Sequence, residues 1–202
     1  MPPITQGLII VTVAVFVLQM AGMGGTLLEL FALWPPGGGF AGPQFLPWQL
    51  LSYGFLHGSL MHLLFNMFGL YMFGSDLERL LGARFFLGYY LASVVTAAVS
   101  HLLVTAVLGL PAAPTIGASG GVFGLLLGFG WYFPRRKLML IIPPIPMPAR
   151  VFVVLYAALE LFLGVSGYGQ GVAHFAHLGG MLGGWLMIQY RRRGFPFGRS
   201  RR

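Results

Sequence analysis

Few side chains in this sequence could take part in chemistry, and most of them lie within long apolar segments. The candidates are His62, Asn66, His101, Ser119, Glu160, His174 and His177. Polar groups are costly at membrane depth, so each one is a candidate functional residue. A serine hydroxyl becomes an effective nucleophile when a base removes its proton, and imidazole can do this near neutral pH. Hydrolysis by a serine and a histidine is therefore the first chemistry to consider.

The residues around Ser119 favour a helix start at this position. Pro111, Pro114 and Gly117 precede it and disfavour helix, so Ser119 is expected near the first turn of the following helix. The first turn presents unpaired N–H groups and the positive end of the helix dipole, which suit a developing oxyanion. Gly117 and Gly120 leave room there for a substrate backbone. A serine at a helix start is more often only an N-cap, and Ser119 taken alone favours that interpretation.

His177 supplies the base that Ser119 would need. A helix rises ~1.5 Å per residue, so Ser119, His177 and His62 each lie ~20 Å from the cytoplasmic end of their own segment. The three residues are therefore expected at one level in the membrane. His62 and Asn66 are spaced i and i+4 on one helix face, and both could donate hydrogen bonds to an oxyanion. The structural alternative is that these residues hydrogen-bond neighbouring helices. A serine and a histidine at one level favour the catalytic interpretation.

The remaining polar residues receive weaker predictions. His174 lies one turn outward of His177 and is an alternative base, whereas His101 is assigned no role. The chain has four carboxylates, at Glu29, Asp76, Glu78 and Glu160. Asp76 and Glu78 are expected at the cytoplasmic face, and Glu160 is expected to hydrogen-bond a neighbouring span. None is assigned to a triad, so we expect a Ser–His dyad whose imidazole is oriented by packing.

Membrane-spanning helices are expected to position these groups. The sequence is 57% hydrophobic and 8% charged, whereas soluble domains carry about a quarter charged residues. The segments that could cross a core of ~30 Å lie near residues 4–22, 58–75, 84–108, 116–133, 151–168 and 172–190. We predict an all-α polytopic membrane protein with a six-helix bundle, formed by residues 1–202 as a single domain. The sequence has no cysteine, which excludes disulfides and thiolate metal sites.

The charge distribution predicts the orientation of the chain. The net charge is +8, and the twelve Lys and Arg residues fall in three groups, at 79–84, 135–150 and 191–202. The positive-inside rule places these groups in the cytoplasm, together with both termini, and the basic tail 191–202 can touch anionic lipid. We therefore expect a multi-pass protein of the cell (inner) membrane with no nucleic-acid partner. Its oligomeric state does not follow from the sequence.

Two loops and two glycine stripes complete the predicted arrangement. Residues 23–57 are expected to form a long non-helical external loop at the membrane interface, where aromatic rings are favoured. The proline-rich stretch 134–150 is expected to be a cytoplasmic loop. Small residues recur every four positions at Gly120, Gly124 and Gly128 and at Ala176, Gly180 and Gly184. Such stripes let helices approach closely, so the fourth and sixth spans are expected to touch.

Three motifs in this order resemble the rhomboid family of intramembrane serine proteases. They are Gly117-Ala118-Ser119-Gly120, the span 62–66 (His-Leu-Leu-Phe-Asn) and the span 176–180 (Ala-His-Leu-Gly-Gly). Leu77-Glu78, Gly82 and Arg84-Phe85 also look like the family's link between the second and third spans. The resemblance covers nearly the whole chain and is to the minimal six-span form found in bacteria.

The resemblance implies a water-filled cavity open to the outside and a Ser119–His177 dyad without cofactor or metal. It implies an oxyanion site made by the Ser119 N–H, Asn66 and His62, with Gly117, Gly120 and Gly180 in support. The implied substrates are single transmembrane helices with a helix-destabilising stretch near the outer leaflet. The implied lateral gate is the external loop with the region that contains Gly164, Gly167, Gly169 and Gly171. The external loop lacks the Trp-Arg pair of some members.

Three other functions are compatible with parts of this pattern. A non-catalytic rhomboid-like protein would bind transmembrane helices, but it would not need both Ser119 and His177. A small transporter or proton relay would be expected to show inverted repeats or paired midplane carboxylates, and neither is found. A metal site at His174 and His177 would need a carboxylate or another third ligand, which the sequence does not place.

Overall fold

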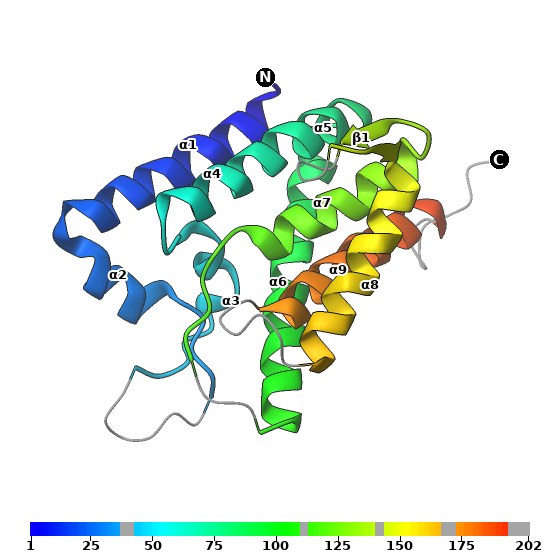
Figure 1. Ribbon diagram of the computed structural model, residues 1–202. Helices are drawn as coiled ribbons and strands as arrows, with labels where there is room; N and C mark the ends of the chain where they lie inside the picture. Colours follow the sequence, from blue (N-terminus) through cyan, green and yellow to red (C-terminus); the bar gives the residue numbers. More distant parts are fainter. Residues whose placement is uncertain (37–42, 110–112, 140–143, 167–172, 194–202) are drawn as a thin grey trace.

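The protein is a bundle of helices with one short hairpin, and this confirms the predicted all-α membrane class. The computed structural model describes residues 1–36, 43–109, 113–139, 144–166 and 173–193 (Figure 1). The helices are α1 (Pro3–Leu18), α2 (Gly24–Phe31), α3 (Gln49–Ser52), α4 (Leu60–Gly69), α5 (Ser75–Leu81), α6 (Ala83–Val107), α7 (Ser119–Tyr132), α8 (Ala149–Ser166) and α9 (His174–Arg193). Short π-helical turns join α1 to α2 (Gln19–Met23) and α4 to α5 (Leu70–Gly74), and a 3-10 turn follows α3 (Tyr53–Phe55).

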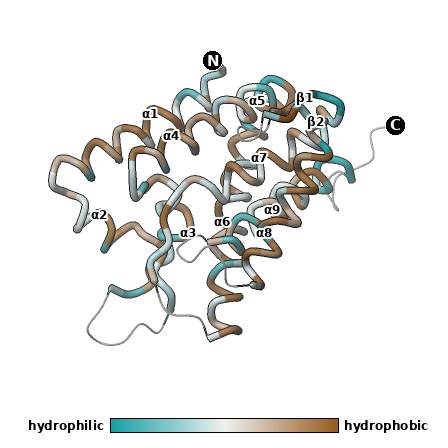
Figure 2. The backbone as a smooth tube through the Cα atoms, viewed as in Figure 1, coloured by the Kyte–Doolittle hydropathy of each residue, from teal (hydrophilic) through white to brown (hydrophobic). Residues whose placement is uncertain are grey.

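Each of the six predicted spans corresponds to a helical segment of the bundle. The segments are α1, the continuous α4–α5 unit, α6, α7, α8 and α9. Among the described residues, three helical segments are long and apolar enough to cross a membrane by themselves: Pro3–Phe31, Ala83–Val107 and Ala149–Ser166. Hydrophobic residues run along the bodies of the helices in Figure 2, and hydrophilic residues gather near α5 and the hairpin. The bundle therefore has the hydropathy of a membrane protein.

Helices α7 and α9 cross in direct backbone contact, as their glycine stripes predicted. A Cβ atom placed on Gly180 would lie 1.9 Å from the carbonyl oxygen of Gly120, and one on Gly124 would lie 2.9 Å from the carbonyl oxygen of Gly180. Helix α6 packs on the same helix α9, because a Cβ on Gly183 would lie 1.9 Å from Thr96 Oγ1. Any side chain at these glycines would force the helices apart and move the residues that they carry.

The expectation of a non-helical segment from Met23 to His57 is wrong in part. The chain turns at Gly22, whose φ of 99° is readily adopted only by glycine, and then continues as α2. Helix α3 and the 3-10 turn that follows it add further helical structure before α4. The sequence Leu27 to Phe31 supports helix well, and the glycine at the kink was not interpreted as a turn between two helices.

The Gln49 side chain joins several parts of the segment 23–57 by hydrogen bonds. Its side chain is fully buried, and its Oε1 accepts hydrogen bonds from the backbone N–H groups of Trp34 and Leu46, each at 3.2 Å. Leu33 and Thr115 exchange two backbone hydrogen bonds of 3.0 Å, which tie this segment to the chain that leads into α7. The external segment is thus fastened next to Ser119.

The stretch 134–150 is not a regular helix, as predicted, but it contains an antiparallel hairpin. Strands β1 (Lys137–Met139) and β2 (Pro146–Pro148) pair Lys137 with Pro148 and Met139 with Pro146. Pairing was not predicted because prolines cannot donate to a ladder and are normally confined to edge strands. In a two-stranded ribbon both strands are edges, so the prolines are tolerated. Pro143 lies outside the described residues.

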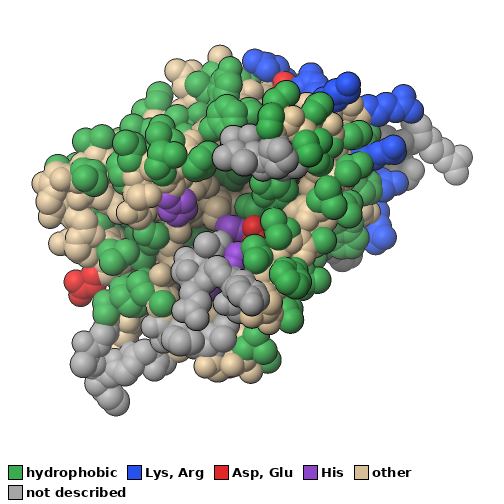
Figure 3. Space-filling model, viewed as in Figure 1, with side chains coloured by type: hydrophobic (Ala, Val, Ile, Leu, Met, Phe, Trp, Pro, Cys, Tyr) green, Lys and Arg blue, Asp and Glu red, His purple; other side chains and the backbone are tan. Residues whose placement is uncertain are grey.

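Basic side chains gather at the end of the bundle that carries α5, the hairpin and the last turn of α9 (Figure 3). The N-terminus lies at the same end (Figure 1). Of the basic tail predicted for 191–202, the structure describes only Arg191 to Arg193, and Arg199, Arg201 and Arg202 lie outside it. The charge is therefore concentrated on one side of the bundle, as the sequence predicted.

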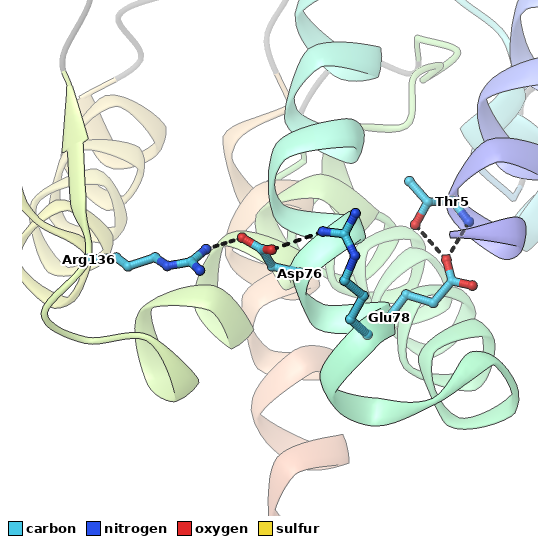
Figure 4. Close-up of polar contacts among 5 residues, drawn as sticks. Thr5, Asp76, Glu78 and Arg136 are labelled. Atoms are coloured by element: carbon cyan, nitrogen blue, oxygen red, sulfur yellow. Dashed lines mark hydrogen bonds and ion pairs between the residues drawn. The ribbon is translucent and has the colours of Figure 1, made fainter. Parts of the chain in front are cut away.

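Two carboxylates hold this basic end together (Figure 4). Glu78, on α5, is buried and accepts hydrogen bonds from the N–H of Ile4 at 2.9 Å and from the N–H and Oγ1 of Thr5, both at 2.7 Å. Asp76 forms ion pairs with Arg136 and with Arg79. Glu78 thus caps the start of α1, where no local side chain does so.

Candidate active site

Ser119 is the first residue of α7, and the preceding turn is possible only with glycine. Gly117 has a φ of 122°, and a Cβ atom there would lie 2.7 Å from two ring atoms of His62. The loop can therefore place Ser119 at the helix start and pass closely over the His62 ring. As the first residue of the helix, Ser119 has an N–H group that the helix itself does not use.

The structure brings His177 and Ser119 into hydrogen-bond contact. His177 Nε2 lies 2.9 Å from Ser119 Oγ. The His177 ring stacks on Phe123, with ring centroids 4.1 Å apart and planes inclined by 5°. Phe123 follows Ser119 by one turn of α7, so the helix that carries the hydroxyl also carries the surface against which the imidazole rests. This geometry suits proton transfer between the two groups.

His62 and Asn66 lie beside this pair on α4. Both line a cavity of about 640 Å³ that also contains Ser119 and His177. Asn66 Nδ2 donates a hydrogen bond of 2.9 Å to the carbonyl oxygen of His62. A side-chain amide carries two N–H donors, so one remains for another acceptor. The i and i+4 spacing therefore does put both side chains at the same cavity.

The cavity is bordered by groups from several parts of the chain. Its other lining residues include Tyr53, Gly58, Ile116, Gly120, Val122 and Ala176. Figure 3 shows histidine side chains and an acidic side chain within a hollow on the face that it displays. Mixed polar and apolar walls of this kind can hold an extended peptide next to the serine hydroxyl.

Glu160 lies beside the proposed general base, a position that the sequence did not indicate. It was left out of the catalytic group, but its Oε2 atom lies 2.9 Å from His177 Nδ1 and 2.7 Å from His174 Nδ1. All three side chains are buried. Packing on Phe123 is therefore not the sole contact that orients the imidazole. The expected hydrogen bond from Glu160 to a neighbouring span is present, and its partner is His174.

His174 contacts Glu160 rather than Ser119, so the structure does not favour it as the base. The ligand atoms of Glu160, His174 and His177 lie within 4.8 Å of one another and could bind a metal ion. The sequence does not place a third ligand for such a site, and in the structure Glu160 is close enough to be one. Two histidines and a glutamate also occur at zinc centres, so the donor set itself is suitable.

The loop before Ser119 is held by residues that the sequence analysis did not assign to the site. The backbone carbonyl oxygen of Tyr53 accepts a hydrogen bond of 3.0 Å from the Gly117 N–H, and the Ala118 N–H donates to His57 Nε2 at 3.4 Å. His57 is the last residue of the predicted external loop, but it is only 2% exposed. Burial, together with the neighbouring His62, lowers the pKa of His57 to about 4. The ring is therefore neutral at physiological pH and can accept this bond.

His101 also has a partner close to the site. Its Nε2 atom lies 2.8 Å from Thr115 Oγ1, in the chain that leads into α7. Of the glycines expected at the gate, Gly164 packs closely on α9, because a Cβ there would lie 3.1 Å from Phe175 Cζ. Gly167, Gly169 and Gly171 lie outside the described residues.

Comparison with known proteins adds independent evidence. Residues 44–194 match the model of the Rhomboid domain family. The chain is 31% identical over 155 residues to "Rhomboid protein 1, mitochondrial" of Saccharomyces cerevisiae, covering 76% of this chain and 44% of the relative. It is 35% identical over 147 residues to "RHOMBOID-like protein 4" of Arabidopsis thaliana, covering 69% and 33%. It is 27% identical over 186 residues to "Rhomboid protease GlpG" of Klebsiella pneumoniae, covering 92% and 62%. The chain thus spans about a third to three-fifths of these relatives' length.

Proposed function

Because this chain belongs to the rhomboid family, we propose that it is an intramembrane serine endopeptidase with Ser119 as nucleophile and His177 as general base. The observation that carries the proposal is the distance of 2.9 Å between Ser119 Oγ and His177 Nε2. A relative named as a protease, "Rhomboid protease GlpG", aligns with most of this chain, which also supports the proposal. A protein that only bound helices would not need this pair.

The proposed reaction starts with proton transfer from Ser119 to His177. Oγ attacks the carbonyl carbon of the scissile bond as its proton passes to Nε2. The tetrahedral intermediate then collapses, and the imidazolium gives the proton to the leaving amine. A water molecule, deprotonated by the same imidazole, releases the acyl group from Ser119. Overall, one peptide bond is hydrolysed and one water molecule is consumed, and Ser119 and His177 return to their starting protonation states.

We assign oxyanion stabilisation to the Ser119 N–H, the Asn66 amide and His62. The N–H group is not used by α7, and both α4 side chains line the same cavity as Ser119. Three glycines support this arrangement. Gly117 lets the loop pass close to the His62 ring, and Gly120 and Gly180 let the backbones of α7 and α9 approach each other. Donors fixed before the reaction stabilise charge without reorganising.

The proposed substrates are single transmembrane helices of membrane proteins with a helix-destabilising stretch near the outer leaflet. A helical backbone uses its carbonyls internally, so the segment must unwind before Ser119 can attack it. Helix α7 has 14 residues and is therefore ~21 Å long, shorter than a ~30 Å core. If its inner end lies at the cytoplasmic interface, Ser119 lies below the outer surface, where such a stretch would arrive.

We further propose that residues 1–202 form one membrane domain in the cell (inner) membrane, with both termini in the cytoplasm. The support is the concentration of basic side chains at the end of the bundle where α1 begins. The positive-inside rule assigns that end to the cytoplasm. The lipid bilayer is then the second partner of the protein.

The test is cleavage of a single-span substrate in liposomes that contain the full chain, its Ser119→Ala variant or its His177→Ala variant. We expect cleavage with the unaltered chain and none above background with either variant. A fluorophosphonate reagent should label the unaltered chain and leave Ser119→Ala unlabelled. Cleavage that persists in Ser119→Ala, with the substrate intact in protein-free liposomes, would refute the proposed mechanism. An unaltered chain that binds but does not cleave would favour the non-catalytic alternative.

A further inference from the structure

Glu160 is a buried carboxylate in a span whose other residues are almost all apolar. Its residue exposure is 7%, and it lies in the middle part of α8. A charged side chain at membrane depth is costly unless it is paired. The partners of Glu160 are two ring nitrogens, His174 Nδ1 at 2.7 Å and His177 Nδ1 at 2.9 Å. The carboxylate therefore faces the proposed general base.

The contact matters because it lies on the opposite nitrogen from the serine. His177 Nε2 faces Ser119 Oγ, so this nitrogen must be the unprotonated one if it is to accept the serine proton. In a neutral imidazole the hydrogen is then on Nδ1. That atom is buried, and among the described residues the Glu160 carboxylate is the acceptor within reach of it. A carboxylate at Nδ1 selects this tautomer.

The contact between Glu160 and His177 is not a well-aligned hydrogen bond, which limits its strength. The distance of 2.9 Å is that of an ion pair, but His177 Nδ1 has no hydrogen bond of proper geometry, whereas His174 Nδ1 and Glu160 do form one. The contact to His177 is therefore electrostatic rather than fully directional. It still stabilises the imidazolium that forms when the serine proton is transferred, because opposite charges interact strongly in a low-dielectric interior.

Helix packing explains why Glu160 reaches His177. Helices α8 and α9 run in opposite directions and are in close contact at Gly164, where a Cβ atom would lie 3.3 Å from His174 Cβ. Glu160 lies one helical turn before Gly164, and His177 lies about one turn after His174. The two side chains therefore meet one turn deeper in the bundle. Phe123 determines the plane of the imidazole ring, and Glu160 faces its edge.

We propose that Glu160 is a positioning residue for His177 and that His174 holds its carboxylate in place. The proposal rests on the proposed Ser119–His177 chemistry and adds Glu160 to it as a third, orienting residue. Glu160 remains ionised throughout: the serine proton moves to Nε2 and later to the leaving amine, while the proton on Nδ1 stays on His177. His174 donates the hydrogen bond that orients the carboxylate. A merely structural glutamate would have no effect on the reactivity of Ser119.

The test compares Glu160→Gln, Glu160→Asp and His174→Gln in the full chain in liposomes, with Glu78→Gln as a matched control. Glu78 is also a buried carboxylate, but it accepts its hydrogen bonds from Ile4 and Thr5, at the start of α1. The readouts are the rate of fluorophosphonate labelling, kcat and KM for a single-span substrate, and the thermal midpoint. The labelling rate reports the nucleophilicity of Ser119 without requiring a transmembrane substrate to bind.

We expect Glu160→Gln to lower kcat and the labelling rate about 10- to 100-fold, less than the ~10⁴-fold cost of losing a well-aligned triad carboxylate. KM should stay within about twofold, because the interaction acts in the transition state. Glu160→Asp, which keeps the charge, should recover part of the rate. His174→Gln should lower the rate less than Glu160→Gln does. Glu78→Gln should lower the thermal midpoint and leave the labelling rate unchanged.

Labelling of Glu160→Gln at the wild-type rate would overturn the proposal. So would rates that fall only in proportion to the thermal midpoint in both Glu160→Gln and Glu78→Gln. Treatment of the unaltered chain with 1,10-phenanthroline should leave its labelling rate unchanged. A loss that Zn²⁺ restores would overturn the proposal in favour of a metal centre at Glu160, His174 and His177. Failure of the Ser119 mechanism is seen separately, as labelling or cleavage that survives Ser119→Ala.

Discussion

Two buried glutamates lie in different parts of the bundle and have partners of different kinds. Glu78, near the basic end, accepts hydrogen bonds from the backbone of Ile4 and from Thr5. Glu160 contacts the ring nitrogens of His174 and His177, and the second of these rings also contacts Ser119. Both side chains are less than a tenth exposed, so burial does not distinguish them.

The difference lies in what each carboxylate fixes in place. Glu78 pairs with N–H groups that the first turn of α1 cannot satisfy by itself, so it holds one helix on another. Glu160 contacts the ring nitrogens of the proposed general base His177 and of its neighbour His174, so it orients groups at the proposed catalytic site. The basic end should therefore respond to mutation mainly in stability. The part of the bundle that carries Ser119, Glu160 and His177, which is the outer end in the proposed orientation, should respond mainly in rate. Each prediction below tests one side of this division.

The largest effect is expected for His177→Asn at the outer end. This change removes the proposed base and leaves a smaller polar side chain beside Phe123. Cleavage should fall by about 10⁴- to 10⁶-fold, as when a catalytic histidine is removed from a serine protease. The thermal midpoint should change little in comparison. Both are measured in liposomes, by product formation and by thermal unfolding. If unfolding accounted for the lost activity, the outer end would be a structural region like the basic end.

Asn66→Ala should have the next largest effect. Loss of one oxyanion donor typically lowers kcat about 100- to 1,000-fold. The bond from Asn66 Nδ2 to the His62 carbonyl lies within one helix, so its loss should cost little stability. Single-turnover cleavage measures the chemical step, and Asn66→Asp is the control that keeps the shape but removes the amide donors. Unchanged turnover in Asn66→Ala would leave Asn66 with a packing role only.

Much of the outer end could be predicted because its signals are local in the sequence. The prolines and Gly117 before Ser119 indicate a helix start, and the stripes that contain Gly120 and Gly180 indicate which helices touch. Ser119 and His177 lie at equal distances from the ends of their segments, which places them at the same level in the bundle. All of these features depend on residue type and spacing, which a sequence provides directly. The hairpin within 134–150 could not be obtained in this way, because its pairing depends on two short segments that prolines would normally disfavour.

The contact between Glu160 and His177 was missed because it depends on the rotation and register of α8 against α9. Helix α8 has hydrophobic residues on every face, so its pattern does not show which side faces the bundle. Depth alone would have been informative: Glu160 lies eleven residues after Ala149, or ~17 Å along the helix. That level is close to the ~20 Å found for Ser119 and His177. The distance of Glu160 from the end of its helix therefore indicates that it could lie beside Ser119 and His177.

Glu78→Gln tests the basic end. The amide would place an N–H donor against the donors of Ile4 or Thr5, and it would remove the negative charge at the start of α1. We expect unfolding to become easier by about 1–3 kcal/mol, the usual cost of losing hydrogen bonds to a buried charged group. The rate per folded molecule should stay within about twofold of the unaltered chain. A loss of rate without a loss of stability would show that the two ends of the bundle are coupled.

Asp76→Asn should have the smallest effect, although Asp76 lies two residues from Glu78. Its partners Arg136 and Arg79 have side chains that are 53% and 63% exposed. Ion pairs in contact with solvent contribute about 0–1 kcal/mol, because water and salt screen them. Thermal unfolding at low and at high salt measures this contribution, and the difference between Asp76→Asn and the unaltered chain should shrink at high salt. A salt-independent cost as large as that of Glu78→Gln would mean that the ion pairs of Asp76 stabilise the basic end as much as the buried glutamate does.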